Sequence, residues 1–216
     1  LGITGAQGAA NLAVAALGAA AQGLYDAGKA VKQAAYDLQK QPWSRADVPE
    51  RDARLGAAKA AATTAMLGDV AETARLQQAA TGAGGLALAP ATVGPPYSPT
   101  IVRGLAIAAL AALGQAGDDN MPEILALMAE PNTGRCMNMS KLNLYQCLAV
   151  ARPHYEDMFC LGQHVMMDTG RCLIQATGLP EPYEPRFVPS EASIAKGYPV
   201  RKPTALTRRC VSMSSL

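Results

Sequence analysis

The sequence has few aromatic residues and no marked excess of charge. Aromatic residues make up 5% of the 216 residues, with two Phe and one Trp, so aliphatic and small side chains must build most of the core. The 19 basic and 17 acidic residues give a net charge of +2, and no basic block stands out. A nucleic-acid interface would need such a block, and we therefore expect no nucleic-acid partner.

The sequence also lacks the motifs of common enzyme classes. The Gly-x-Gly-x-x-Gly and Walker patterns that cradle phosphates are absent, and so is the Gly-x-Ser-x-Gly elbow of serine hydrolases. The triplet Asp168-Thr169-Gly170 has the letters of the aspartic-protease motif, but that motif belongs at a strand end and here it lies in a helical period. We expect a non-enzymatic protein without a cofactor.

Long hydrophobic runs are missing as well. The longest apolar stretches, residues 9–21 and 101–113, are shorter than the roughly 18–20 residues that span a bilayer. We expect both to be buried helices, with 101–113 as the central element of the core. Contact with a membrane surface is left open.

What the first half has in abundance is Ala and Gly in a helical pattern. Residues 6–40 predict one long helix in which Leu17, Leu24, Val31 and Leu38 recur every seven positions. Small residues fill the positions three and four further on, which is a coiled-coil period that allows close approach of another helix. We expect these four large residues to form an interaction surface, and the glycines at 18, 23 and 28 to lie beside a partner backbone.

Two further segments complete the first half. A second helix is predicted from a cap at Asp47 to about Ala80, and we expect it to fold back on the first as an antiparallel hairpin domain, residues 1–82. Residues 83–99 contain Gly-Gly and several prolines and predict a connecting strap without helix. Leu86, Leu88 and Val93 favour a strap that is packed on the surface.

The second half predicts a helical domain, residues 100–178, and a proline-rich extended tail, residues 179–216. Ser98-Pro99 should start a helix that ends near Gly117, and Asp118 to Asn120 should cap the next, which Pro131 and Gly134 end. Two arms, 139–151 and 155–177, follow on either side of Pro153. The fold class is therefore all-α, a bundle of about six helices.

Four of the five cysteines lie in these arms, with the spacing C-x10-C-x12-C-x11-C. In an antiparallel hairpin, Cys147 would oppose Cys160 and Cys136 would oppose Cys172. Cys136 and Cys147, eleven residues apart, share one helix face within about 20°. Cys160 and Cys172, twelve apart, differ by about 120°, which fits only if the helix is distorted, for example at Gly170. Two nested disulfides would require an oxidising compartment: the periplasm, the cell exterior or the mitochondrial intermembrane space.

Three other uses of the cysteines remain open. Cys160 and His164 stand one helical turn apart and, with Cys147 and His154, could hold zinc. Cys160 could be a nucleophile with His164 as its base. All four cysteines could also be reduced core residues.

We therefore expect a helical assembly protein of the cell envelope or the secreted space, which binds a protein partner or itself. A membrane-active secreted effector is the first alternative. A small metal- or thiol-dependent enzyme that uses Cys147, Cys160 and His164 is the second.

Overall fold

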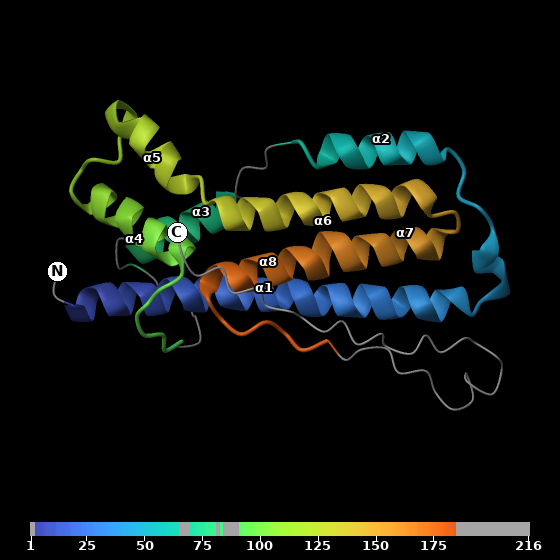
Figure 1. The fold of residues 1–216 in the computed structure, drawn as a ribbon, viewed down its shortest axis with the longest axis horizontal. Helices are drawn as coiled ribbons and strands as arrows, with labels where there is room; N and C mark the ends of the chain where they lie inside the picture. The colour runs from blue at the N-terminus through green and yellow to red at the C-terminus, as the bar shows by residue number, and fades with distance from the viewer. Residues whose placement is uncertain (1–2, 65–69, 81–82, 84–90, 185–216) are drawn as a thin grey trace, which may run out of the picture. The chain divides into compact units, whose positions relative to one another are not determined.

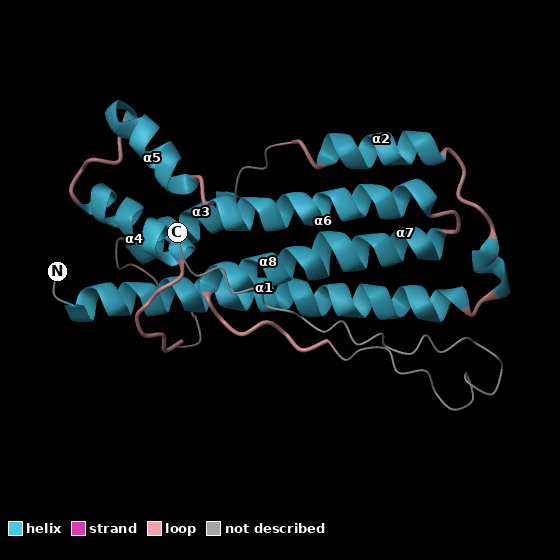
Figure 2. Cartoon of the chain, viewed as in Figure 1, coloured by secondary structure: helices cyan, strands magenta, loops and turns pink. Residues whose placement is uncertain are grey.

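The computed structural model describes residues 3–64, 70–80, 83 and 91–184, and it confirms the all-α class (Figure 1). Figure 2 shows helices joined by loops, and the described residues contain no strand, only one isolated β-bridge between Asp47 and Pro153. The elements in chain order are α1 (Ile3–Gln39), η1 (Pro42–Arg45), α2 (Arg51–Ala61), α3 (Val70–Ala80), α4 (Pro99–Ala112), η2 (Asp118–Asn120), α5 (Met121–Met128), α6 (Pro131–Val150), α7 (His154–Cys160), η3 (Leu161–Met167) and α8 (Asp168–Thr177).

The chain divides into one compact unit, residues 1–182, and a second, residues 183–216. Only Tyr183 and Glu184 of the second unit belong to the described residues. The predicted extended conformation of the tail therefore lies almost wholly outside them, as do Leu86 and Leu88 of the strap.

Helix α1 is the element against which the arm α7–η3–α8 packs. Most of its buried positions follow the heptad period, and apart from Tyr25 and Val14 they are Ala or Gly and not the leucines. The buried residues are Ala10, Val14, Ala15, Gly18, Ala21, Tyr25, Gly28 and Ala35. Leu17, Leu24, Val31 and Leu38 are half-buried beside this seam. The predicted period thus lies next to a contact within the chain, and a role of these four residues in binding another subunit stays a prediction.

Glycines bring the two backbones of this seam together. A Cβ on Gly28 would lie 2.8 Å from the main-chain oxygen of Gly162, and one on Gly170 would lie 2.9 Å from the main-chain oxygen of Ala21. A Cβ on Gly18 would lie 2.7 Å from the Leu179 side chain, whereas Gly23 has nothing within 4 Å. The close approach to a partner backbone is therefore confirmed at Gly28, whereas Gly18 meets a side chain and Gly23 meets nothing.

The second helix differs from the prediction in length and in partner. It ends at Ala61, a turn follows, and α3 begins at Val70. The helix α2 lies against α6 and not along α1 (Figure 1). Arg51 donates to the main-chain oxygen of Ala149 and Arg54 pairs with Asp157, so charged side chains attach α2 to the cysteine arms. The expected packing of the second helix along the first is therefore wrong for α2, and residues 1–82 as a domain stay a prediction.

The cysteine hairpin forms as predicted. Cys136 bonds to Cys172 and Cys147 to Cys160, each with a Cα–Cα distance of 5.7 Å. The second arm runs without a break from His154 to Thr177 and packs along α6. The expectation of a distortion was right, but its place was not Gly170.

The π-helix η3 provides the distortion that the cysteine spacing requires. Its wider turns rotate each residue by about 85° instead of about 100°, so seven residues unwind the arm by about 105°. This nearly cancels the 120° mismatch between Cys160 and Cys172. Both sulfurs can therefore face α6.

Helix α6 starts earlier than expected, because Pro131 begins this helix as well as closing α5. Glu130 is its N-cap, and its carboxylate accepts from the main-chain N–H of Thr133 at 2.6 Å and of Asn132 at 3.1 Å. The hydrogen bond from Thr133 holds the pKa of Glu130 below its ordinary value of 4.5. Proline suits this first position, since its missing N–H would be unpaired there anyway.

Helix α4 begins at the predicted cap, where Ser98 accepts from the main-chain N–H of Ile101. Ile101 packs on Ala10 and Val14 of α1, and Val93 of the strap joins this cluster. The strap is also fixed by the N–H of Val93, which donates to the Asn11 side chain at 2.9 Å. Beyond Ile101, however, α4 is largely exposed. The expectation that residues 101–113 form the central core was therefore wrong.

The glycine seam generates a prediction about stability. Gly28→Ala should destabilise the fold by about 1–3 kcal/mol, because its new methyl group would press on the main chain of residue 162. Gly23→Ala is the matched control and should stabilise by up to about 1 kcal/mol through helix propensity, since it meets no neighbour within 4 Å. Urea unfolding measures both variants. Equal effects of the two substitutions would contradict the seam.

Candidate functional site

A cluster of polar side chains lies at the π-helix η3. A π-helix of seven residues is unusual, since most are single turns, and such turns occur frequently at functional sites. Gly162 lets η3 lie directly on α1: a Cβ at this position would be 2.9 Å from the main-chain nitrogen of Lys32. The segment therefore brings its own side chains next to those of α1.

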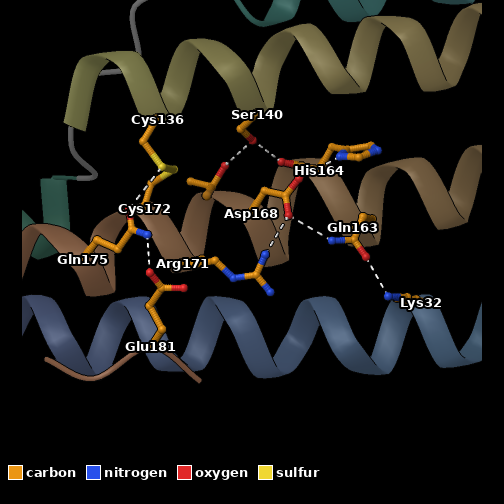
Figure 3. Close-up of polar contacts among 11 residues, drawn as sticks. Lys32, Cys136, Ser140, Gln163, His164, Asp168, Arg171, Cys172, Gln175 and Glu181 are labelled. Carbon is orange, nitrogen blue, oxygen red and sulfur yellow. Dashed lines mark hydrogen bonds and ion pairs between the residues drawn. A yellow bond between two sulfur atoms is a disulfide. The ribbon is translucent and has the colours of Figure 1, made fainter. Parts of the chain in front are cut away.

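Asp168, the first residue of α8, is the centre of this cluster (Figure 3). Its carboxylate oxygens lie 2.8 Å from His164 Nδ1, 2.9 Å from Gln163 Nε2 and 3.6 Å from an Arg171 nitrogen. Lys32 Nζ of α1 donates to Gln163 Oε1 at 2.7 Å and so extends the network to the neighbouring helix. The side chains of His164 and Asp168 are each 17% exposed, which reduces solvent screening of the pair.

The cluster contains Ser, His and Asp, but their geometry does not form a catalytic triad. A triad needs the serine hydroxyl on the imidazole ring. Ser140 instead donates to the main-chain oxygen of His164, and its hydroxyl also lies 3.4 Å from that of Thr169 (Figure 3). Because a carboxylate only accepts hydrogen bonds, the Nδ1–H of His164 donates to Asp168. The arrangement ties α6, η3, α8 and α1 together.

The alternative readings of the cysteines do not fit this geometry. Cys160 is bonded to Cys147, so neither sulfur is the thiolate that a nucleophile or a zinc ligand requires. His154 lies exposed at the start of α7. Within residues 3–64, 70–80 and 91–184, no three His, Cys, Asp or Glu side chains group as a metal site.

Sequence reasoning found the cysteines and missed the cluster. Asp168 was considered only as part of a protease triplet, and Lys32, Gln163 and Arg171 were not singled out. One signal was available, because His164 and Asp168 are four residues apart and face each other on a helix. The link to Lys32 had no such signal, since it joins residues 131 positions apart in the chain.

A scan of protein-family models found no match to the chain, and searches of curated proteins and of solved structures found none either. Among the described helices, none has the length and apolar character to cross a membrane.

The network predicts that Asp168 contributes to stability. Asp168→Ala should destabilise the fold by about 1–3 kcal/mol, because it leaves the donors of His164 and Gln163 unpaired at a partly buried position. The matched control is Asp37→Ala on α1, whose carboxylate pairs with Lys40 in solvent and should contribute little. Thermal unfolding monitored by circular dichroism compares the two. A loss at Asp168 no larger than that at Asp37 would show that the network is not structural.

Proposed function

We propose that this chain is a non-enzymatic, disulfide-stabilised helical protein that acts outside the cytoplasm as a subunit of a homo-oligomeric assembly. The observation that supports it most directly is the α4–α5 apolar surface, which we define as Val102, Leu113, Met121, Leu125 and Met128. These side chains are 38–74% exposed, although each is large and apolar. Exposed apolar clusters of this kind mark sites of protein contact.

The α4–α5 apolar surface follows from helical spacing. Met121, Leu125 and Met128 recur at the i, i+4 and i+7 positions of one helix face. Val102 and Leu113 are eleven residues apart and share one side of α4. Leu113, Leu125 and Met128 are 74%, 55% and 64% exposed. Both helices thus present large apolar side chains that are exposed in the described part of the chain.

The pair α4–α5 is also held in a defined arrangement. Arg103 of α4 donates from one guanidinium nitrogen to the main-chain oxygens of Ala126, Leu127 and Ala129, at 3.0, 3.3 and 3.2 Å. A positive charge suits these carbonyls, because they lie at the C-terminal end of α5. A surface that is fixed in advance loses less entropy on association.

A protein partner fits this surface better than an anionic membrane does. Asp118, Asp119 and Glu123 lie exposed at its edge, and their charges would be repelled by acidic lipids. A second copy of the chain is the partner we propose, since most soluble assemblies are symmetric homo-oligomers. The metal- or thiol-dependent enzyme is not proposed further, because Cys147 and Cys160 are joined.

The assembly can be tested by light scattering coupled to size exclusion. The wild-type chain should show a mass above the 22.4 kDa of one copy, rising with concentration. Leu125→Asp should weaken association by more than about tenfold without lowering the melting temperature, because it places a charge in an apolar contact. Val70→Asp is the matched control, since Val70 is 84% exposed and lies on α3. A wild-type monomer at every concentration, or equal effects of both variants, would overturn the proposal.

The extracytoplasmic address rests on the two disulfides and has its own test. Peptide mapping of the non-reduced protein from its native source should find Cys136 joined to Cys172 and Cys147 to Cys160. Chain entropy gives about 3 kcal/mol for the inner bridge and about 4 kcal/mol for the outer one, so reduction should lower stability markedly. Free thiols in the native protein would contradict an oxidising compartment.

A further inference from the structure

We propose that the groove between the last turns of α1 and α6 and the helix α7 is a binding site for a small alkylated ammonium ion. The aromatic groove, as we call it, encloses about 440 Å³ and is lined mainly by Tyr36, Gln39, Val150, Tyr155, Glu156 and Phe159. Its volume falls within the range of small-molecule sites, about 300–1,000 Å³. It is separate from the α4–α5 apolar surface, with which it shares no residue.

The walls of the aromatic groove are fixed before a ligand enters. The Cys147–Cys160 disulfide, whose two residues also line the groove, joins α6 to α7. Arg54 pairs with Asp157 on the neighbouring position of α7. The N–H of Val48 donates to the main-chain oxygen of Arg152 at 2.8 Å and anchors the turn between the two arms. Such a preformed site avoids the cost of ordering on binding.

Three aromatic rings supply the apolar part of the groove. Tyr36 and Phe159 pack with their ring centroids 5.8 Å apart and their planes tilted by 55°. Tyr155 contributes the third ring from α7. Lys32 Nζ already lies 5.6 Å from the Phe159 centroid, which leaves the two tyrosines as the rings for a cationic ligand. Tyrosine faces attract cations through the ring quadrupole.

The charge of the groove selects the ligand class. Among the described residues that line it, Glu156 is the one with a formal charge. One carboxylate oxygen accepts from the main-chain N–H of Arg152 at 2.8 Å, which holds the side chain in place. The Arg152 guanidinium lies 3.9 Å from a carboxylate oxygen of Asp47. A negative charge beside aromatic rings favours an organic cation and disfavours an anion.

The apolar residues that line the groove favour an alkylated cation over a bare ammonium ion. A bare ammonium ion is strongly hydrated and would lose that hydration against Val150 and the rings. Methyl groups spread the charge over an apolar surface, and aromatic sites recognise such ions for this reason. We therefore expect a quaternary or highly methylated ammonium group, carried on an apolar or hydroxylated body that Gln39 and the tyrosine hydroxyls can meet.

The test compares two water-soluble probes of the same shape. Choline and its uncharged analogue 3,3-dimethyl-1-butanol should be titrated into the full chain and followed by amide NMR shifts. Choline should shift residues around Tyr36 and Tyr155, and the uncharged analogue should bind at least about tenfold more weakly. Equal binding of the two probes would overturn the proposal. The absence of shifts at choline concentrations up to about 10 mM would overturn it as well.

Substitutions assign the contribution of each group. Glu156→Gln keeps an oxygen that accepts from Arg152 and removes the charge, so choline affinity should fall about tenfold. Tyr155→Leu should cost about fivefold through the lost ring face. Glu123→Gln is the matched control for the charge, lies on α5 outside the groove, and should leave affinity unchanged. Unchanged choline binding in Glu156→Gln, with its melting temperature preserved, would also overturn the proposal. The oligomeric state tests the proposed assembly and not this binding site.

Discussion

The contact of backbone with backbone between α1 and the arm η3–α8 is the constraint on which the structure depends. Gly28 and Gly162 meet there, and Gly170 meets the main chain near Ala21. At this distance dispersion contacts are dense, while each side chain buries little area. The small residues at Gly18, Ala21, Gly28 and Ala35 of α1 are thereby explained, because larger side chains there would separate α1 from the arm to which the Lys32–Gln163 contact also joins it.

The close seam also sets where the large apolar residues lie. The seam accepts small side chains and Tyr25, so the leucines of α1 are displaced to its margins. The apolar helices α4 and α5 bury only Ile101 and Ile124, and their other residues stay half-buried or exposed. A core made of small residues thus leaves large ones at the surface, and this surface is where we place the assembly contact.

Local signals in the sequence predicted much of the fold, and contacts distant in the chain were predicted less well. The caps at Ser98 and the turn at Pro153 depend on a few neighbouring residues, and both were found. The disulfide pairing followed from symmetric spacing around that turn. By contrast, Arg51 attaches α2 to α6 and Arg54 attaches it to α7, and the partners of both lie about a hundred residues away in the chain. The prediction that residues 101–113 form the central core rested on hydrophobicity alone. It was wrong because composition does not show which apolar helix packs against other helices.

The candidate site was hidden for a related reason. Its central residue, Asp168, belongs to a helix whose phase is changed by the seven residues before it. A regular helical projection therefore misplaces every side chain after Leu161. The Lys32–Gln163 contact could not be inferred without knowing that η3 lies on α1.

The π-helix allows the two arms of the cysteine hairpin to differ in length. Eleven positions separate the two cysteines of α6, and twelve separate those of the opposite arm. Because a π-helix turns less per residue, it accommodates the one additional residue of this arm between the same two disulfides. One arm of the hairpin can thus differ in length from the other while both ends stay in step, and the surplus is accommodated at the place where His164 and Asp168 meet.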